Sequence, residues 1–368
     1  MSFFFYSQVF LSLFLFIYIY HNIRFYRNFH VKSGIDILTK KHVSVVVCAR
    51  NEEKNIRNLL ESLVTQDYDP AYVEIIIAND QSTDGTEQVL LDYSENYSNI
   101  SYIDVKDRGQ AVSPKKNALR QAISRAKGEI ILLTDADCEP SPNWISSHIG
   151  IYTESPETDM VVGFARTKMP NHTMCQIYEH VDFLILMFAA QGAIQAGIPF
   201  SASGQNLSYK KSVYDELNNF EGLEGYISGD DLLLLQKFVG NKKKVKFACY
   251  LNSFTETQPV NSWKELFNQR ARWASNMKAM PRMNFRFFVY LISCFICIGI
   301  LPFTAFYLYA VKVFSDMYYI LYALESHKLE KFDKYSLVLW VIFSPFYVLI
   351  VTFRGMCSIF EWKGRIGG

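Results

Sequence analysis

Two carboxylates one residue apart, Asp135 and Asp137, follow an apolar stretch of strand length at residues 130–133. Such a run is typical of a buried parallel strand, because helices cover both faces of a parallel sheet. Ligands of open α/β sheets bind at the carboxyl ends of the strands, and two hard oxygen donors there suit Mg²⁺ or Mn²⁺ held against a diphosphate. An acidic turn after a strand is the alternative interpretation of the same two residues.

Polar side chains also follow two earlier runs of strand character. Arg50 and Glu52 come after the β-branched run at residues 42–48, and Asp80 comes after the apolar run at residues 73–78. Because a nucleotide would lie at the carboxyl edge of such a sheet, we expect it beside these three side chains. Asp80 would accept a hydrogen bond from the base or the ribose, unless it only caps and turns the chain.

Charged residues open two predicted helices. Lys115 and Lys116 begin one of them, and we expect Lys116 to contact the nucleotide through its phosphates; a solvated basic helix start is the alternative. Asp230 and Asp231 precede four leucines and begin the other, where they stabilise the helix through its dipole. A carboxylate at this position is also expected to have a lowered pKa, which keeps it ionised as a general base requires.

A third set of polar residues, Gln269, Arg272 and Trp273, stands just before the apolar C-terminal part of the chain. An arginine can hold a pyrophosphate through two hydrogen bonds as negative charge develops on it. A tryptophan can pack against a sugar or lie at a membrane interface, and interface anchoring alone would explain its presence.

The elements that must position these residues alternate between strand and helix. Three such steps occur between residues 42 and 126, and the strand before Asp135 follows them. This alternation predicts an α/β domain with a doubly wound, mostly parallel sheet. A further strand is expected at residues 160–166.

Apolar runs at both ends of the chain predict membrane helices. The run at residues 3–20 is followed by basic residues, which indicates an uncleaved anchor with the rest of the chain on the cytoplasmic side. Runs at residues 287–314 and 335–353 precede Arg354, Lys363 and Arg365, which favours an even number of C-terminal crossings and three spans in total. The run at residues 181–200 contains Asp182, Gln191 and Gln195, and we expect a buried or interfacial helix there.

The charge of the chain is nearly balanced, with 37 Lys and Arg against 36 Asp and Glu. No overall field favours binding to nucleic acid, so any site for phosphate must be local. The seven cysteines form no paired pattern, which suits reduced thiols in a protein that faces the cytosol.

Taken in order, the motifs CARNEE, IANDQSTDGT, LLTDADCEP, SGDD and QRARW resemble those of the inverting family 2 glycosyltransferases. The resemblance covers residues 42–280 and is strongest to the membrane-bound branch, which includes cellulose, hyaluronan and poly-N-acetylglucosamine synthases and ceramide glucosyltransferases. It implies a GT-A fold, a nucleotide-sugar donor and a divalent cation.

The resemblance also implies roles for individual residues. Asp80 corresponds to the acid that contacts the nucleotide, Asp137 to the residue that coordinates the metal and Asp135 to its neighbour nearer the sugar or ribose. Asp231 corresponds to the catalytic base. The Gln-x-x-Arg-Trp motif at residues 269–273 would lie near the pyrophosphate and the acceptor.

Two positions depart from the family pattern. Asn79 stands where the family usually has the first Asp of an Asp-Asp pair, which weakens the nucleotide assignment of Asp80. Asp230 stands where the family usually has Glu, which leaves Asp231 as the base but makes Asp230 a rival.

The expected organisation is an anchor at residues 1–22, a cytosolic GT-A domain at 40–280, two transmembrane helices within 285–355 and a cytosolic tail at 356–368. The expected function is sugar transfer from a nucleotide sugar, with UDP-sugar favoured, to a lipid-linked or glycan acceptor at the cell membrane. A processive polysaccharide synthase and a catalytically silent protein that binds nucleotide sugar are the alternatives.

Overall fold

The computed structural model describes residues 2–35, 39–105, 113–223, 225–226, 228–251, 253–329, 335–362 and 365–366, so Lys363 lies outside it. The chain divides into two compact units. We call residues 32–168 and 201–258 the sheet unit, and residues 1–31, 169–200 and 259–368 the helical unit. Three separate segments of the chain therefore form the helical unit. The second and third of them begin within residues 40–280, which were expected to form one domain.

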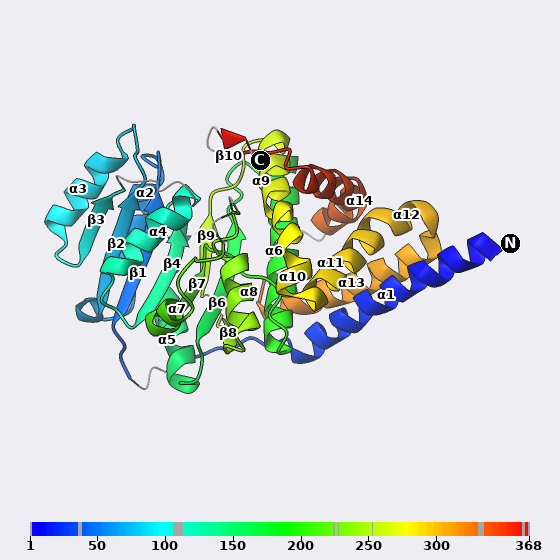
Figure 1. Cartoon of the computed structure of the whole chain (residues 1–368), viewed down its shortest axis with the longest axis horizontal. Coiled ribbons are helices and arrows are strands. Elements are labelled where there is room, and N and C mark those ends of the chain that lie inside the picture. The colour runs from blue at the N-terminus through cyan, green and yellow to red at the C-terminus, as the bar shows by residue number, and fades with distance from the viewer. Residues whose placement is uncertain are drawn as a thin grey trace. The chain divides into compact units, whose positions relative to one another are not determined.

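The sheet unit is built on one mixed sheet, in the order β3-β2-β1-β4-β7-β6-β9-β5, with β8 paired to β6 (Figure 1). Strands β1 to β4 are parallel neighbours, whereas β7 runs antiparallel to β4 and β6. The strands are β1 Val43–Ala49, β2 Val73–Asn79, β3 Ile100–Asp104, β4 Ile130–Asp135, β5 Cys138–Pro140, β6 Met160–Thr167, β7 Leu207–Lys210, β8 Val245–Ala248 and β9 Phe254–Thr257. The predicted doubly wound, mostly parallel sheet is confirmed.

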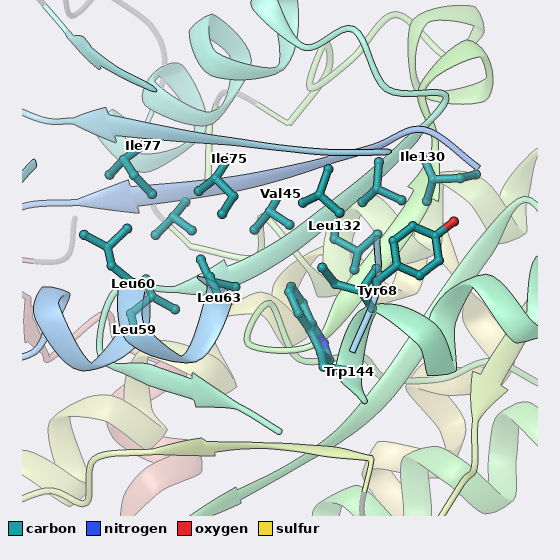
Figure 2. Packing of buried hydrophobic residues seen from close by; sticks show 14 of the residues in the cluster. Val45, Leu59, Leu60, Leu63, Tyr68, Ile75, Ile77, Ile130, Leu132 and Trp144 are labelled. Atoms are coloured by element: carbon teal, nitrogen blue, oxygen red, sulfur yellow. The ribbon is translucent and has the colours of Figure 1, made fainter. Parts of the chain in front are cut away.

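Helices pack on this sheet through regularly spaced apolar residues. Helix α2, Ile56–Val64, turns Ile56, Leu59, Leu60 and Leu63 inward, as the 3.6-residue period of an amphipathic helix requires. Figure 2 shows Leu59, Leu60 and Leu63 facing the side chains of β1, β2 and β4. Burial of each leucine side chain contributes about 1.5–3 kcal/mol to stability, so these contacts hold α2 against this face of the sheet. The other helices of the unit are α3 Thr86–Asn96, α4 Pro114–Arg125, α5 Trp144–Glu154, α7 Lys211–Glu216 and α8 Leu232–Gly240, with a short 3₁₀ turn at Pro70–Tyr72.

The helical unit contains the apolar ends of the chain and the helix α6. Its long helices are α1 Ser2–Asn28, α6 Met174–Gln195, α9 Trp263–Ser275, α11 Phe285–Phe295, α13 Phe306–Ser326 and α14 Tyr335–Met356. Its shorter elements are the 3₁₀ turn Asn276–Ala279, α10 Met280–Met283, a π-helical turn Ile296–Ile300, α12 Leu301–Thr304, and the strands β10 Glu361–Trp362 and β11 Arg365–Ile366.

Four helical segments in the described part of the chain are long and apolar enough to cross a membrane: Phe5–Asn28, Met174–Gln195, Phe285–Thr304 and Tyr335–Met356. The second of these, α6, differs from the others because 72% of its apolar stretch is buried, against 33–39% for the rest. This burial agrees with the helix expected near residues 181–200, although α6 begins and ends earlier in the chain.

The apolar run at residues 287–314 forms two helices rather than one. Helix α12 ends at Thr304, two residues after Pro302, and α13 begins at Phe306. The break lies at Ala305, whose φ of −151° and ψ of 70° are not helical. Helix α13 takes in the short apolar run at residues 317–324 and packs against α1 and α12.

Candidate active site

The register of the parallel strands brings three of the predicted motifs to one edge of the sheet. Cys48 on β1 pairs with Asp135 on β4, and Ala49 pairs with Asn79 on β2. The residues that follow these strands therefore emerge side by side. This is the carboxyl edge, where ligands of open α/β sheets bind.

Asp80 is held at this edge with part of its carboxylate unsatisfied. Arg50 donates from Nη1 to the backbone oxygen of Asp80 at 3.1 Å and lies 3.5 Å from its Oδ2. Asp80 is buried, and among the described residues its Oδ1 has no hydrogen-bond partner. A buried acceptor without a donor costs about 1–3 kcal/mol, so a ligand hydroxyl or N–H would stabilise this site.

Glu52 lies where the turn after β1 meets the loop after β2. Its backbone N–H donates to Thr86 Oγ1 at 2.8 Å, and its Oε2 accepts from Asn55 Nδ2 at 2.9 Å. The contact with Thr86 joins the turn after β1 to the start of α3, and the contact with Asn55 lies within the turn. The structure thus places Glu52 beside Arg50 and gives it a role in shaping the edge.

The departure at Asn79 has a structural cause. Asn79 pairs in register with Asp104 on β3 and donates from Nδ2 to Asp104 Oδ1 at 2.9 Å. Its Oδ1 accepts from the backbone N–H of Ser82 at 3.2 Å. An aspartate here would face the carboxylate of Asp104, and like charges on neighbouring strands are destabilising.

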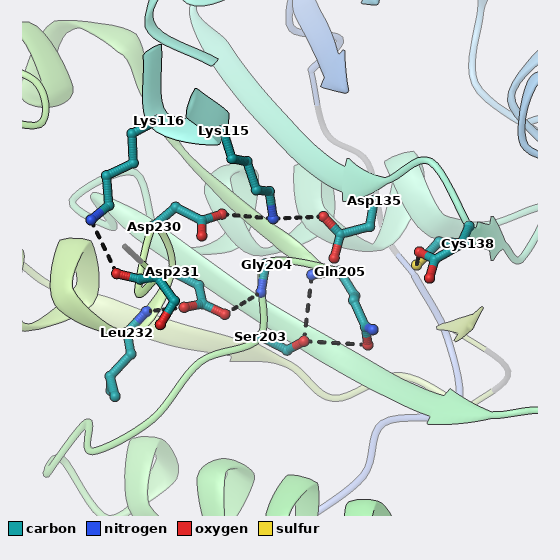
Figure 3. Close-up of polar contacts among 12 residues, drawn as sticks. Lys115, Lys116, Asp135, Cys138, Ser203, Gly204, Gln205, Asp230, Asp231 and Leu232 are labelled. Carbon is teal, nitrogen blue, oxygen red and sulfur yellow. Dashed lines mark hydrogen bonds and ion pairs between the residues drawn. The ribbon is translucent and has the colours of Figure 1, made fainter. Parts of the chain in front are cut away.

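Lys115 joins two of the acidic motifs. Its Nζ lies 2.8 Å from Asp135 Oδ1 and 2.8 Å from Asp230 Oδ2 (Figure 3). Burial disfavours the charge of Lys115, but the two carboxylates outweigh it and raise the pKa of the ammonium well above its usual value. Asp230 is buried too, yet Lys115 lowers its pKa and keeps it ionised.

Asp231 is the N-cap residue of α8 and is held by two backbone donors. Its Oδ1 accepts from the N–H of Leu232 at 2.6 Å, and its Oδ2 accepts from the N–H of Gly204 at 2.9 Å (Figure 3). Burial, followed by the negative charge of Asp230, raises the pKa of Asp231. The expected lowering by the helix N-terminus is therefore reversed, and Asp231 is a stronger base than an ordinary aspartate.

The Gly204 turn is supported by a buried polar network. Asn206 accepts at Oδ1 from Trp144 Nε1 at 2.9 Å and from His148 Nε2 at 2.7 Å. The other ring nitrogen of His148 lies 2.7 Å from Ser208 Oγ. The sequence carried the pattern Ser203-Gly-Gln-Asn206 without a chemical reason to single it out, because these partners come from a distant helix.

Asp135 and Asp137 are carboxylates of the kind that bind a divalent cation together with a ligand. Asp137 accepts at its backbone oxygen from Gln258 N at 3.3 Å, and its Oδ1 lies 3.7 Å from Cys138 Sγ. Within the described ranges, no three His, Cys, Asp or Glu side chains gather as a metal cage. Two carboxylates fit Mg²⁺ or Mn²⁺, which are commonly bound by one or two carboxylates together with substrate phosphates.

The two lysines that open α4 have different partners. The ammonium group of Lys116 donates to the backbone oxygens of Leu223, Tyr226 and Ser228, whereas Lys115 contacts the carboxylates. Lys115, and not Lys116, is therefore the cation beside Asp135. Both share a helix start, so the sequence alone gave no means of separating them.

Gln269, Arg272 and Trp273 lie on α9, which belongs to the helical unit, whereas the acids belong to the sheet unit. Arg270, between them, donates to Gln269 Oε1, and its guanidinium lies 4.1 Å from the centre of the Trp273 ring. Arg272 accepts at its backbone oxygen from Ser275 Oγ at 2.6 Å. The sheet unit thus contains every predicted site residue except these three.

Comparison with known proteins finds a family match over residues that include most of the sheet unit. Residues 44–217 match the family model described as Glycosyl transferase family 2. A probable glycosyltransferase of Bacillus subtilis, YdaM, is 26% identical over 63% of this chain and 54% of its own length. Glycosyltransferase AglE of Haloferax volcanii is 23% identical over 72% of this chain and 83% of its own length.

Two further relatives are synthases. A beta-monoglucosyldiacylglycerol synthase of Nostoc is 26% identical over 63% of this chain and 48% of its own length. A poly-beta-1,6-N-acetyl-D-glucosamine synthase of Staphylococcus epidermidis is 24% identical over 49% of this chain and 42% of its own length. The chain therefore spans only about half of the length of most of these relatives.

A solved structure has the same fold. The mannosyltransferase PcManGT from Pyrobaculum calidifontis, solved in complex with GDP-Man and Mn²⁺, matches 95% of this chain and 96% of its own with a TM-score of 0.61 and 15% identity. The sheet order, the family match and this likeness agree. Residues 44–217 are a family 2 glycosyltransferase domain, and the fold is GT-A.

Proposed function

We propose that the protein is an inverting glycosyltransferase that moves a sugar from a nucleotide sugar, a UDP-sugar in the first place, to a lipid-linked or glycan acceptor. The observation that carries the proposal is Asp231, a carboxylate of raised pKa that two backbone N–H groups aim from the start of α8. Through Asp230 and Lys115 it belongs to the same charged cluster as Asp135.

In this proposal Asp231 removes the proton of the acceptor hydroxyl. The acceptor oxygen forms its bond to the anomeric carbon as the bond to the diphosphate oxygen breaks, so the configuration inverts. The nucleoside diphosphate leaves with the electron pair, and the proton stays on Asp231. Lys115 offsets negative charge beside the leaving group, and Arg272 would do the same from the Gln-x-x-Arg-Trp motif.

Asp135 and Asp137 would hold a divalent cation, Mg²⁺ or Mn²⁺. When bound, such a cation supplies positive charge that stabilises the departing diphosphate. Asp80 and Arg50 would bind the nucleoside, with the unsatisfied Oδ1 of Asp80 accepting from the base or the ribose.

The protein would be anchored in the cell membrane as a multi-pass protein, with the sheet unit on the cytoplasmic side. Candidate spans at both ends of the chain support the anchor, and the basic residues after α1 support the orientation by the positive-inside rule. A cytoplasmic position would also give the site access to nucleotide sugars.

Turnover of a nucleotide-sugar panel tests the proposal. The full chain in lipid nanodiscs would be given membrane lipid extract as acceptor, with Mg²⁺, Mn²⁺ or a chelator. We expect turnover of at least one donor, lost with the chelator, and a fall of about 10²–10⁴-fold in Asp231→Asn with donor binding retained. Asp215→Asn, an exposed carboxylate on α7, is the matched control.

The outcomes separate the possible functions. Near-normal turnover by Asp231→Asn would contradict the assigned base. No turnover of any donor would favour a catalytically silent protein that binds nucleotide sugar.

A processive synthase is the second candidate, because a poly-beta-1,6-N-acetyl-D-glucosamine synthase is among the relatives. The length of the product decides between the two activities. A single added sugar supports a simple transferase, whereas a ladder of long chains supports a synthase.

A further inference from the structure

The buried Lys116 stands outside the chemistry proposed above. It is the third residue of α4 and is 0% exposed. Its Nζ donates to the backbone oxygens of Leu223 at 3.0 Å, Tyr226 at 2.6 Å and Ser228 at 3.0 Å. An ammonium group is costly to bury unless its donors are satisfied, and three carbonyl oxygens supply the acceptors it needs.

The three carbonyl groups precede the acidic pair. Ser228 is followed by Gly229, whose φ of +83° turns the chain in a way that favours glycine, and then by Asp230 and Asp231. The position of Ser228 therefore decides where the backbone enters the acidic pair. The Lys116 ammonium fixes that position from outside the segment.

Lys115 and Lys116 hold the same segment in two ways. Figure 3 shows the Lys115 ammonium between Asp135 and Asp230, and the Lys116 ammonium on the far side, directed away from Asp135. Lys115 thus holds a side chain of the acidic pair, while Lys116 holds the backbone before it. The start of α4 connects the Asp135 side of the site to the Asp231 side.

We propose that Lys116 is a positioning residue for Asp231, acting through a ring of three backbone carbonyl groups that requires a cationic donor. The proposal rests on the proposed function in that Asp231 serves as the base. It predicts that Lys116 affects the chemical step more than donor binding, because its ammonium group holds the backbone that leads into the acidic pair.

Lys116→Ala tests this by removing the ammonium and leaving its space. We expect kcat to fall by about 10–100-fold, the size of loss that a misplaced catalytic group produces, with the KM for the donor nearly unchanged. n-Propylammonium, which matches the missing part of the side chain, should restore turnover in a saturable manner. n-Propanol, of similar size but neutral, should not.

Controls separate this role from a general effect on folding. Lys244 is an exposed lysine of the same unit that pairs with Glu157. Lys244→Ala should keep the parent kcat, and n-propylammonium should not change it. Lys116→Gln keeps a neutral donor on a shorter side chain, and we expect it to lose kcat as well. Donor binding and the thermal unfolding midpoint would be measured for each variant.

Three results would overturn the proposal: an unchanged kcat in Lys116→Ala, a loss that n-propylammonium does not restore, or a loss of donor binding and folding in both variants. The last would make Lys116 a residue of the fold alone. Failure of the proposed function is distinguishable, because it would appear as undiminished turnover in Asp231→Asn whatever Lys116→Ala does.

Discussion

The helical unit buries ion pairs within and between its helices, whereas the sheet unit holds a buried neutral network and a partly exposed cluster of charges at its carboxyl edge. In the helical unit Asp182 on α6 accepts from Arg270 on α9 at 3.0 Å, and Lys312 lies 2.6 Å from Asp316 on α13. Hydroxyl and amide groups add to both pairs; Tyr18 donates to Asp316 at 2.9 Å. All four charged side chains are buried.

The sheet unit shows the opposite arrangement. Its interior network of Trp144, His148, Asn206 and Ser208 carries no charge, because burial lowers the pKa of His148 to about 4. The cluster around Lys115 retains access to solvent, with 22% of the Lys115 side chain exposed. The same residue types therefore form buried pairs in one unit and a partly exposed cluster in the other.

The largest effect on folding is expected from Asp182→Leu. This change leaves Arg270 buried without its carboxylate, which costs about 3–5 kcal/mol in the free energy of unfolding. The double variant Asp182→Leu with Arg270→Met should recover most of the loss, because replacing a buried pair by apolar groups is often neutral. Unfolding in mixed micelles would measure both. Equal stability of the single variant and the parent would show that the pair is not structural.

The neutral network predicts a loss of stability in acid. The pKa of His148 is about 4 in the folded protein and about 6.5 when unfolded, so only the unfolded chain binds this proton between these values. Stability should therefore fall as the pH drops from 6.5 to 4, by up to about 3 kcal/mol.

His148→Gln should remove that part of the pH dependence, as followed by denaturant unfolding at several pH values. His42→Gln changes an exposed histidine and should keep the parent slope. A slope that survives in His148→Gln would mean that His148 is not the group responsible.

Asp135→Asn tests whether the cluster around Lys115 differs from the structural ion pairs of the helical unit. In this variant Lys115 retains its ion pair with Asp230, and the lost pair with Asp135 is partly exposed. We therefore expect the free energy of unfolding to change by about 1 kcal/mol or less. Turnover with Mn²⁺ should nevertheless fall by about 10²-fold or more. Unfolding and initial rates on one preparation would test both. A large loss of stability with intact turnover would place this cluster with the structural pairs.

The smallest effect is expected at Asn79. Asn79→Asp places two carboxylates on neighbouring strands and loses the hydrogen bond to Asp104, at a cost of about 1 kcal/mol. Adding Asp104→Asn should restore the parent stability. If the double variant is no more stable than Asn79→Asp, the pair with Asp104 does not explain the asparagine.

Sequence reasoning located the parallel half of the sheet to within about two residues. The runs at residues 42–48 and 73–78 became β1 Val43–Ala49 and β2 Val73–Asn79, because continuous β-branched stretches have few alternatives to a buried strand. The strands β7, β8 and β9 were not predicted. Each has four residues, too few for a periodic signal, and is defined by its partner in the sheet.

By itself the sequence determined which motifs exist and the order in which strand ends present them, since both are local properties of the chain. Only the tertiary structure decided that Lys115 meets the carboxylates while Lys116 holds carbonyl groups, and that the pKa of Asp231 is raised. Burial and Coulomb interactions depend on distances between residues far apart in the chain, such as Asp135 and Asp230, and those distances are fixed only when the sheet is assembled.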